Sequence, residues 1–275
     1  MAMADAFELK PHKDRLFAYP DILEMRHGGR YRIVDYREQR DINRRDQTPE
    51  RRVRSDYVKA SVNRAMADLV LETAAGSITH YAVGKQTSAR VIVVYLHGQG
   101  GNRRQGVNDW TFGGNFNRIK ALMADNGGLF LSPDFSDFGA KGLAQVKALL
   151  VHYSAASPGA AVIVACGSAG GQLCHALARD GEIGGKLGGI LLLGSLWDDG
   201  FVGSKAFKAR VPLFIGHGSR DTVFSINGME AFFDSILTAV PNYPVMMVRF
   251  ETGTHGTPIR MSDWREAINW MLSKR

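Results

Sequence analysis

Three polar residues that each follow an apolar run have side chains suited to nucleophilic catalysis. Ser168 follows the run AVIVACG, and Asp221 and His255 come after VPLFIGHG and PVMMVRF. A serine hydroxyl becomes a strong nucleophile when an imidazole accepts its proton, and a carboxylate holds that imidazole in the required tautomer. The chain order of serine, acid and histidine predicts Ser168 as nucleophile, Asp221 as acid and His255 as general base.

The segment CGSAG places small residues on both sides of Ser168, between a strand-like run and a helix-like segment. A sharp strand-to-helix turn that exposes a nucleophile requires small residues two positions before and after it. Gly170 meets this requirement, while Cys166 stands where the usual Gly-x-Ser-x-Gly pattern has its first glycine. Two other interpretations remain: the turn only joins strand to helix, or the helix N-terminus binds a phosphate.

The glycine-rich segment HGQGG (97–101) directly follows the apolar run VIVVYL. Its glycines allow the backbone to turn N–H groups toward a reacting carbonyl, which needs two such donors for its developing negative charge. The predicted oxyanion hole consists of the main-chain N–H groups of Gln99 and Ala169. His97 is interpreted as a structural residue of this turn.

The identity of the acid has an alternative. Asp221 could instead cap a turn, as an aspartate after a strand often does. Asp198 and Asp199, in the segment GSLWDDGF after another apolar run, are the competing acid positions.

Strand-like and helix-like segments alternate from about residue 69 onward, which predicts a mostly parallel central sheet with helices on both faces. The segment 69–84 reads as a hairpin around Ala75 and Gly76, and a last helix is expected to begin at Ser262 as its N-cap. Six apolar runs are predicted as the central strands: 91–97, 128–135, 160–167, 188–195, 211–218 and 244–250.

The blocks HGQGG, CGSAG, HGSRD and GTHG resemble the conserved blocks of the α/β-hydrolase superfamily, over about residues 69–275. Among its members, the chain is similar to the compact, minimally capped carboxylesterases, lysophospholipases and thioesterases. The resemblance implies an α/β-hydrolase fold for residues 67–275, with residues 1–66 as an N-terminal extension. It also implies an acyl-enzyme mechanism and no metal or organic cofactor.

The extension is charged and weakly periodic, with a strand-like YRIVDY (31–36) and a helix expected over 57–66. It could be a mobile arm, an added edge strand or a partial cover over the site. Acidic residues interrupt its arginines, so the net charge of +7 does not indicate a nucleic-acid partner. Cys166 and Cys174 are interpreted as small core residues, too few for a disulfide framework.

Aromatic residues near the expected strand ends could form a substrate pocket or could be ordinary packing. The candidates are Trp110, Phe112, Phe116, Trp197, Phe201 and Phe224.

We therefore expect a serine hydrolase that cleaves carboxylic esters or thioesters of small molecules. The alternatives are an acyltransferase with the same triad and a catalytically silent binding protein. The opening residues lack the apolar run of a signal peptide, and no run is long enough to span a membrane, so a cytoplasmic location is expected. The sequence leaves open the natural substrate and whether the chain forms a homo-oligomer.

Overall fold

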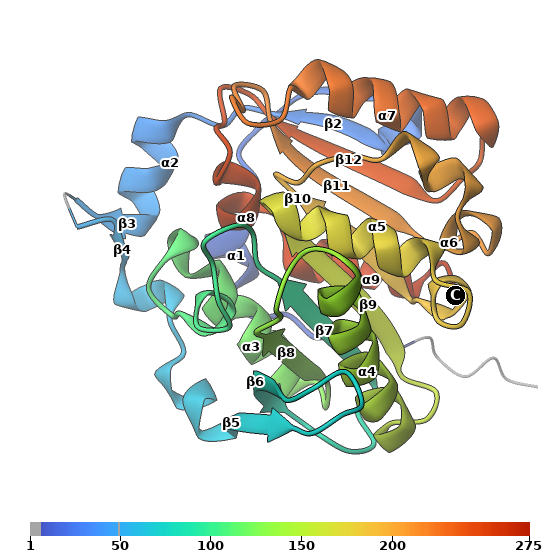
Figure 1. Ribbon diagram of the computed structural model, residues 1–275. Coiled ribbons are helices and arrows are strands. Elements are labelled where there is room, and N and C mark those ends of the chain that lie inside the picture. The colour runs from blue at the N-terminus through green and yellow to red at the C-terminus, as the bar shows by residue number, and fades with distance from the viewer. Residues whose placement is uncertain (1–6, 49) are drawn as a thin grey trace, which may run out of the picture.

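The main feature of the fold is a ten-stranded sheet, as the computed structural model of residues 7–48 and 50–275 shows (Figure 1). The strand order is β1-β2-β12-β11-β10-β9-β7-β8-β6-β5, and the run from β2 to β8 is parallel throughout. The strands are β1 (Ile22–Arg26), β2 (Tyr31–Val34), β5 (Met66–Leu71), β6 (Ile78–Gly84), β7 (Val91–Leu96), β8 (Leu129–Pro133), β9 (Ala161–Gly167), β10 (Gly189–Leu193), β11 (Leu213–Gly218) and β12 (Val245–Phe250).

The predicted central strands and the 69–84 hairpin are confirmed, because each apolar run forms a strand within a few residues of its expected bounds. A strand covered on both faces needs apolar side chains at successive positions. In β7 all six residues are buried, and alternate side chains enter two separate cores. Ile92 and Val94 point to one face of the sheet, and Val91 and Val93 point to the other.

Helices cover both faces of the sheet. The face seen in Figure 1 carries α4 (Ala140–Ala156), α5 (Gly171–Arg179) and α7 (Ile226–Ala239), whose apolar side chains share one core with the strands. The opposite core contains α3 (Asn115–Asp125) and α9 (Trp264–Leu272). The predicted α/β architecture is therefore correct.

Ser262 is not the N-cap of the last helix, contrary to the expectation. It ends the short helix α8 (Thr257–Met261), and the next residue, Asp263, caps α9 by accepting a hydrogen bond from the Glu266 amide. A carboxylate at this position satisfies a free amide and also complements the positive end of the helix dipole. Ser262 and Asp263 are neighbours in the sequence, and both residue types are good N-caps. Because α8 ends at Ser262, Asp263 is left to cap α9.

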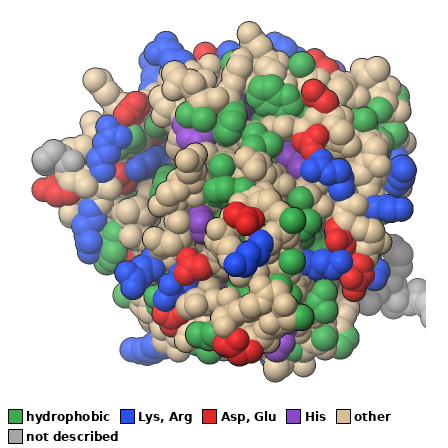
Figure 2. Space-filling view, viewed as in Figure 1, with side chains coloured by type: hydrophobic (Ala, Val, Ile, Leu, Met, Phe, Trp, Pro, Cys, Tyr) green, Lys and Arg blue, Asp and Glu red, His purple; other side chains and the backbone are tan. Residues whose placement is uncertain are grey.

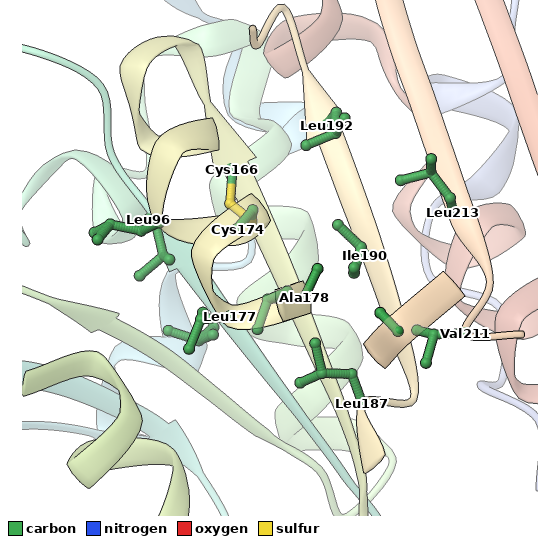
Figure 3. Packing of buried hydrophobic residues seen from close by; sticks show 14 of the residues in the cluster. Leu96, Cys166, Cys174, Leu177, Ala178, Leu187, Ile190, Leu192, Val211 and Leu213 are labelled. Atoms are coloured by element: carbon green, nitrogen blue, oxygen red, sulfur yellow. A yellow bond between two sulfur atoms is a disulfide. The ribbon is translucent and has the colours of Figure 1, made fainter. Parts of the chain in front are cut away.

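Cys166 on β9 and Cys174 on α5 are joined by a disulfide, which the sequence analysis did not predict (Figure 3). Both residues are fully buried, so the expectation that they belong to the core is correct. Figure 3 shows the pair between α5 and the strands, among side chains such as Leu96 and Leu177. The bond connects the strand and the helix on either side of Ser168.

The N-terminal extension adds strands to the edge of the sheet, one of the three roles considered for it. β2 pairs in parallel with β12, and β1 pairs antiparallel with β2 at the outer edge. The following helix α2 (Glu38–Arg45) leads to a small ribbon of β3 (Asp46–Gln47) and β4 (Arg52–Val53). The helix expected over 57–66 is instead two short 3-10 segments, Ser55–Tyr57 and Ala60–Ala65.

Charged side chains of both signs are interspersed over the face shown in Figure 2, including the part formed by the extension. Within residues 7–48 and 50–275, no helix is both long and apolar enough to cross a membrane.

Candidate active site

Ser168 lies directly after β9, at the sharp turn into α5. Its φ is +52°, a left-handed conformation that costs energy for a residue with a side chain. The turn brings the backbone at Gly170 close to the end of β7, since a Cβ on Gly170 would lie 2.5 Å from the Leu96 carbonyl oxygen. Gly170 is therefore required by packing, as the CGSAG pattern predicted. The strained turn leaves the Ser168 side chain partly exposed at the carboxyl edge of the sheet.

Ser168, His255 and Asp221 form one hydrogen-bonded chain. The His255 Nε2 atom lies 2.9 Å from Ser168 Oγ, and His255 Nδ1 lies 2.8 Å from Asp221 Oδ2. The three residues come from turns after β9, β11 and β12, and parallel strands bring these turns to one edge. The arrangement is the one in which an imidazole can accept the hydroxyl proton.

Asp221 is almost fully buried and is held on both oxygens. Its Oδ2 accepts from His255, and its Oδ1 accepts from the amides of Val223 and Phe224. Burial alone would raise the pKa of this carboxyl, but the hydrogen bonds from His255 and the two amides outweigh burial and hold the pKa below its usual value. Asp221 therefore carries its negative charge beside the imidazole.

The competing acids do not reach His255. Asp198 forms an ion pair with Arg179, and its Oδ1 caps a 3-10 turn by accepting from the Gly200 amide. Asp198 and Asp199 both line a separate cavity of about 660 Å³ next to α5. Of the acids considered, the structure places only Asp221 against the imidazole.

The loop after β7 lies directly over the serine. A Cβ on Gly98 would be 2.7 Å from the Cβ of Ser168, so only glycine allows this approach. The backbone amide of the next residue, Gln99, donates no hydrogen bond within the described residues. The second candidate donor, the amide of Ala169, belongs to the residue directly after Ser168. The imidazole of His97 stacks on Phe135 with the ring centroids 4.2 Å apart, and burial lowers the pKa of His97.

A cavity of about 190 Å³ opens beside Ser168 and His255. Of the predicted aromatic residues, only Phe112 lines it. The cavity is also lined by residues that the sequence analysis did not single out, namely Tyr95, Gln105 and Ile259. The Tyr95 hydroxyl donates to Gln105 Oε1 at 3.3 Å, which places polar groups in the wall.

The remaining aromatic residues lie elsewhere, so the predicted pocket is largely wrong. Phe201 and Phe116 are core residues, because both are almost completely buried. Trp110 packs near Tyr57 of the extension, and Trp197 lines the larger cavity next to α5. Phe224 does not line the cavity, but its ring centroid is 5.5 Å from that of His255.

No group of three or more metal-ligating side chains that could hold an ion occurs in the described part of the chain.

Solved structures with a similar fold include several hydrolases. A lidless α/β serine hydrolase from Xanthomonas campestris has 13% identity and a TM-score of 0.54, with 76% of this chain and 94% of that chain covered. An esterase from Pyrococcus furiosus has 16% identity and a TM-score of 0.54, with 76% and 92% covered. A thermostable esterase has 14% identity and a TM-score of 0.61, with 77% and 63% covered.

These likenesses show that the chain has the α/β-hydrolase fold, as the sequence blocks predicted. No protein-family model matches the chain, and no curated protein is significantly similar to it in sequence.

Proposed function

We propose that the protein is a serine hydrolase that cleaves carboxylic esters or thioesters through an acyl-enzyme intermediate. The observation that carries this proposal is the hydrogen-bonded chain from Ser168 Oγ through His255 to the buried Asp221. The amides of Gln99 and Ala169 next to the serine support it, because an ester carbonyl needs donors for its developing charge.

In the first half of the reaction, Ser168 Oγ attacks the carbonyl carbon while its proton passes to His255 Nε2. The carbonyl oxygen becomes an anion that accepts hydrogen bonds from the amides of Gln99 and Ala169. Asp221 stabilises the imidazolium and keeps Nδ1 protonated. The tetrahedral intermediate then expels the alcohol or thiol, which takes the proton from His255 Nε2, and the acyl group stays on the serine.

In the second half, water gives a proton to His255 and attacks the acyl carbon. The new tetrahedral intermediate releases the carboxylic acid, and the proton returns to Ser168 Oγ. The cycle balances with one water consumed for each ester bond cleaved. The cavity of about 190 Å³ at the serine favours compact acyl groups over long chains.

Water access favours hydrolysis over acyl transfer. The His255 side chain is 29% exposed, so solvent reaches the imidazole that would deprotonate the attacking water. An acyltransferase would need to exclude water from this position while it admits another alcohol or amine. A catalytically silent binding protein is disfavoured, because such a protein would not need a serine, an imidazole and a carboxylate that are hydrogen-bonded to one another.

The first test is labelling of the purified protein with a fluorophosphonate probe, read by intact mass. We expect one probe per chain and no label on the Ser168→Ala variant, since only an activated serine attacks the probe. Turnover of p-nitrophenyl acetate by the wild-type protein, lost in Ser168→Ala and His255→Ala, extends the test to catalysis. A folded protein that neither reacts with the probe nor turns over the ester would contradict the proposal.

A further inference from the structure

A second cavity of about 190 Å³ adjoins the catalytic cavity. Phe112 and Gly256 line both of them, and a Cβ on Gly256 would lie 3.7 Å from the Phe112 ring. The second cavity is also lined by Thr254 and Thr257, which flank His255 along the chain. It therefore lies next to the residue that protonates the leaving group in the proposed reaction.

One wall of this second cavity comes from the N-terminal extension. Glu38 at the start of α2 and Arg51 between β3 and β4 both line it, and their side chains form an ion pair of 2.9 Å. The opposite wall contains Arg260 of α8. The extension thus completes a cavity beside the site in addition to extending the sheet.

The Arg260 guanidinium has N–H groups that donate no hydrogen bond within the described residues. The residue is 9% exposed, and its Nη1 atom forms an ion pair of 2.9 Å with the buried Asp46. Within the described part of the chain the Arg260 guanidinium donates no hydrogen bond, and its Nη1 is a buried atom without a hydrogen-bond partner. A nearly buried guanidinium with unused donors in a cavity wall is suited to bind an anion.

A buried arginine adds a positive charge next to Arg260. Arg45 is 3% exposed, its Nη1 donates to the Arg260 carbonyl at 2.7 Å, and no carboxylate among the described residues pairs with it. Burial lowers the pKa of Arg45 to about 10. In this cluster Glu38 pairs with Arg51 and Asp46 pairs with Arg260, while Arg45 has no carboxylate within ion-pair distance among the described residues. Since an uncompensated buried charge is costly, an anion in the cavity would stabilise the cluster.

We infer that this second cavity, which we call the basic subsite, binds a carboxylate or phosphate group on the alcohol part of the substrate. The inference rests on the proposed function, in which His255 delivers a proton to the leaving alcohol. Groups that flank His255 therefore contact the alcohol side of the ester, while the cavity at Ser168 takes the acyl group. The preferred substrates are small esters of anionic alcohols.

The test compares matched acetate esters in which only the charge of the alcohol changes. Acetoxyacetate is compared with acetoxyacetamide, and acetoxyethyl phosphate with acetoxyethanol, with acid release followed by pH-stat titration. We expect the wild-type protein to have a higher kcat/KM for the anionic member of at least one pair. The pair with the larger ratio identifies carboxylate or phosphate as the better ligand.

Two opposite substitutions at the exposed rim then test the basic subsite without disturbing the core. Arg51→Gln is expected to lower the anionic-to-neutral ratio of kcat/KM by up to about fivefold, the upper end of what an exposed ion pair contributes. Glu38→Gln removes a competing carboxylate and is expected to raise the ratio. Arg44→Gln is the matched control, because this exposed arginine of α2 changes the net charge without lining the cavity.

The outcomes separate the two proposals. Turnover of the neutral esters with no preference for the anionic ones, or an equal change of the ratio in Arg44→Gln and Arg51→Gln, overturns the basic subsite while the hydrolase stands. If neither ester is cleaved and the fluorophosphonate probe does not react, the hydrolase proposal fails. Calorimetric titration with hydroxyethyl phosphate and with glycolate then still tests the basic subsite. The proposal requires that the Arg51→Gln variant binds at least one of these two anions more weakly than the Arg44→Gln variant does.

Discussion

Gly98 faces Ser168 at a separation that no larger residue can adopt. A Cβ at position 98 would lie 2.7 Å from the serine Cβ and 3.3 Å from its Oγ. The loop that carries the Gln99 amide can approach Ser168 only because residue 98 has no side chain.

Gly98→Ala should therefore inactivate the protein without unfolding it. The added methyl group must displace either the loop or the Ser168 side chain, and loss of one oxyanion donor typically costs about 10²–10³ in kcat. We expect a loss of at least about a hundredfold in kcat/KM for p-nitrophenyl acetate. Gly203→Ala is the matched control, since a Cβ there meets no atom within 4 Å. Full activity of Gly98→Ala would remove this loop from the oxyanion hole.

The sheet and the proximity of Ser168, Asp221 and His255 could be predicted from the sequence because strong local patterns encode them. Buried parallel strands require continuous apolar runs, and the residues directly after them must gather at one edge. Ser168, Asp221 and His255 each follow such a run, so their positions along the chain predict that they lie close together at one edge of the sheet. The chain order of the three residues then distinguished them from other polar residues.

The cavity walls could not be predicted in the same way. Phe201 and Trp110 follow the same kind of pattern as Phe112, but the first enters the core and the second packs near the extension. Which loop aromatic faces the serine depends on long-range packing that no local pattern records. The role of Arg260 depends on Arg45, some 215 positions away along the chain.

Asp221→Asn should separate the acid from its competitors. An asparagine keeps the hydrogen bonds from the Val223 and Phe224 amides, but it favours the wrong imidazole tautomer and cannot stabilise the imidazolium. We expect kcat to fall about 10³–10⁴-fold. Asp198→Asn, whose side chain contacts Arg179 and not His255, should change kcat less than about twofold. Steady-state kinetics of both variants decide the matter, and the reverse pattern would transfer the acid role to Asp198.

Asp221 should also make folding stability depend on acidity. Its folded pKa lies below the usual value, while the unfolded chain has a pKa of about 3.9. The unfolded state therefore binds the proton more readily, and the contribution of the carboxylate is complete above about pH 4 and lost as the pH falls through the folded pKa. The Tm difference between wild type and Asp221→Asn should stay nearly constant from about pH 6 to pH 4 and shrink as the pH falls further toward about pH 3.

The exposed Asp234 provides the control for this measurement. Asp234→Asn should show a small Tm difference that varies little over the same range. An equal acid dependence in both variants would mean that Asp221 gains no protection from its contacts with His255 and the two amides.

The Cys166–Cys174 disulfide should stabilise the turn that carries Ser168. The two residues are 8 positions apart, and closing so short a loop contributes about 2–3 kcal/mol on the chain-entropy model. In a chain of this size that corresponds to a fall in Tm of about 3–5 °C on reduction. The Cys166→Ala/Cys174→Ala double variant is the control, because reductant should leave its Tm unchanged.

The state of this pair in the isolated protein can be measured by alkylation of the denatured chain, read by intact mass. We expect no alkylation without reductant and two alkyl groups after reduction, because both cysteines are in the bond. Disulfides persist mainly in oxidising compartments. Two alkyl groups without reductant would show free thiols, contradict the bond and favour the cytoplasmic location expected from the sequence. The expected result would instead favour an oxidising compartment, because a cytoplasmic protein would be kept reduced.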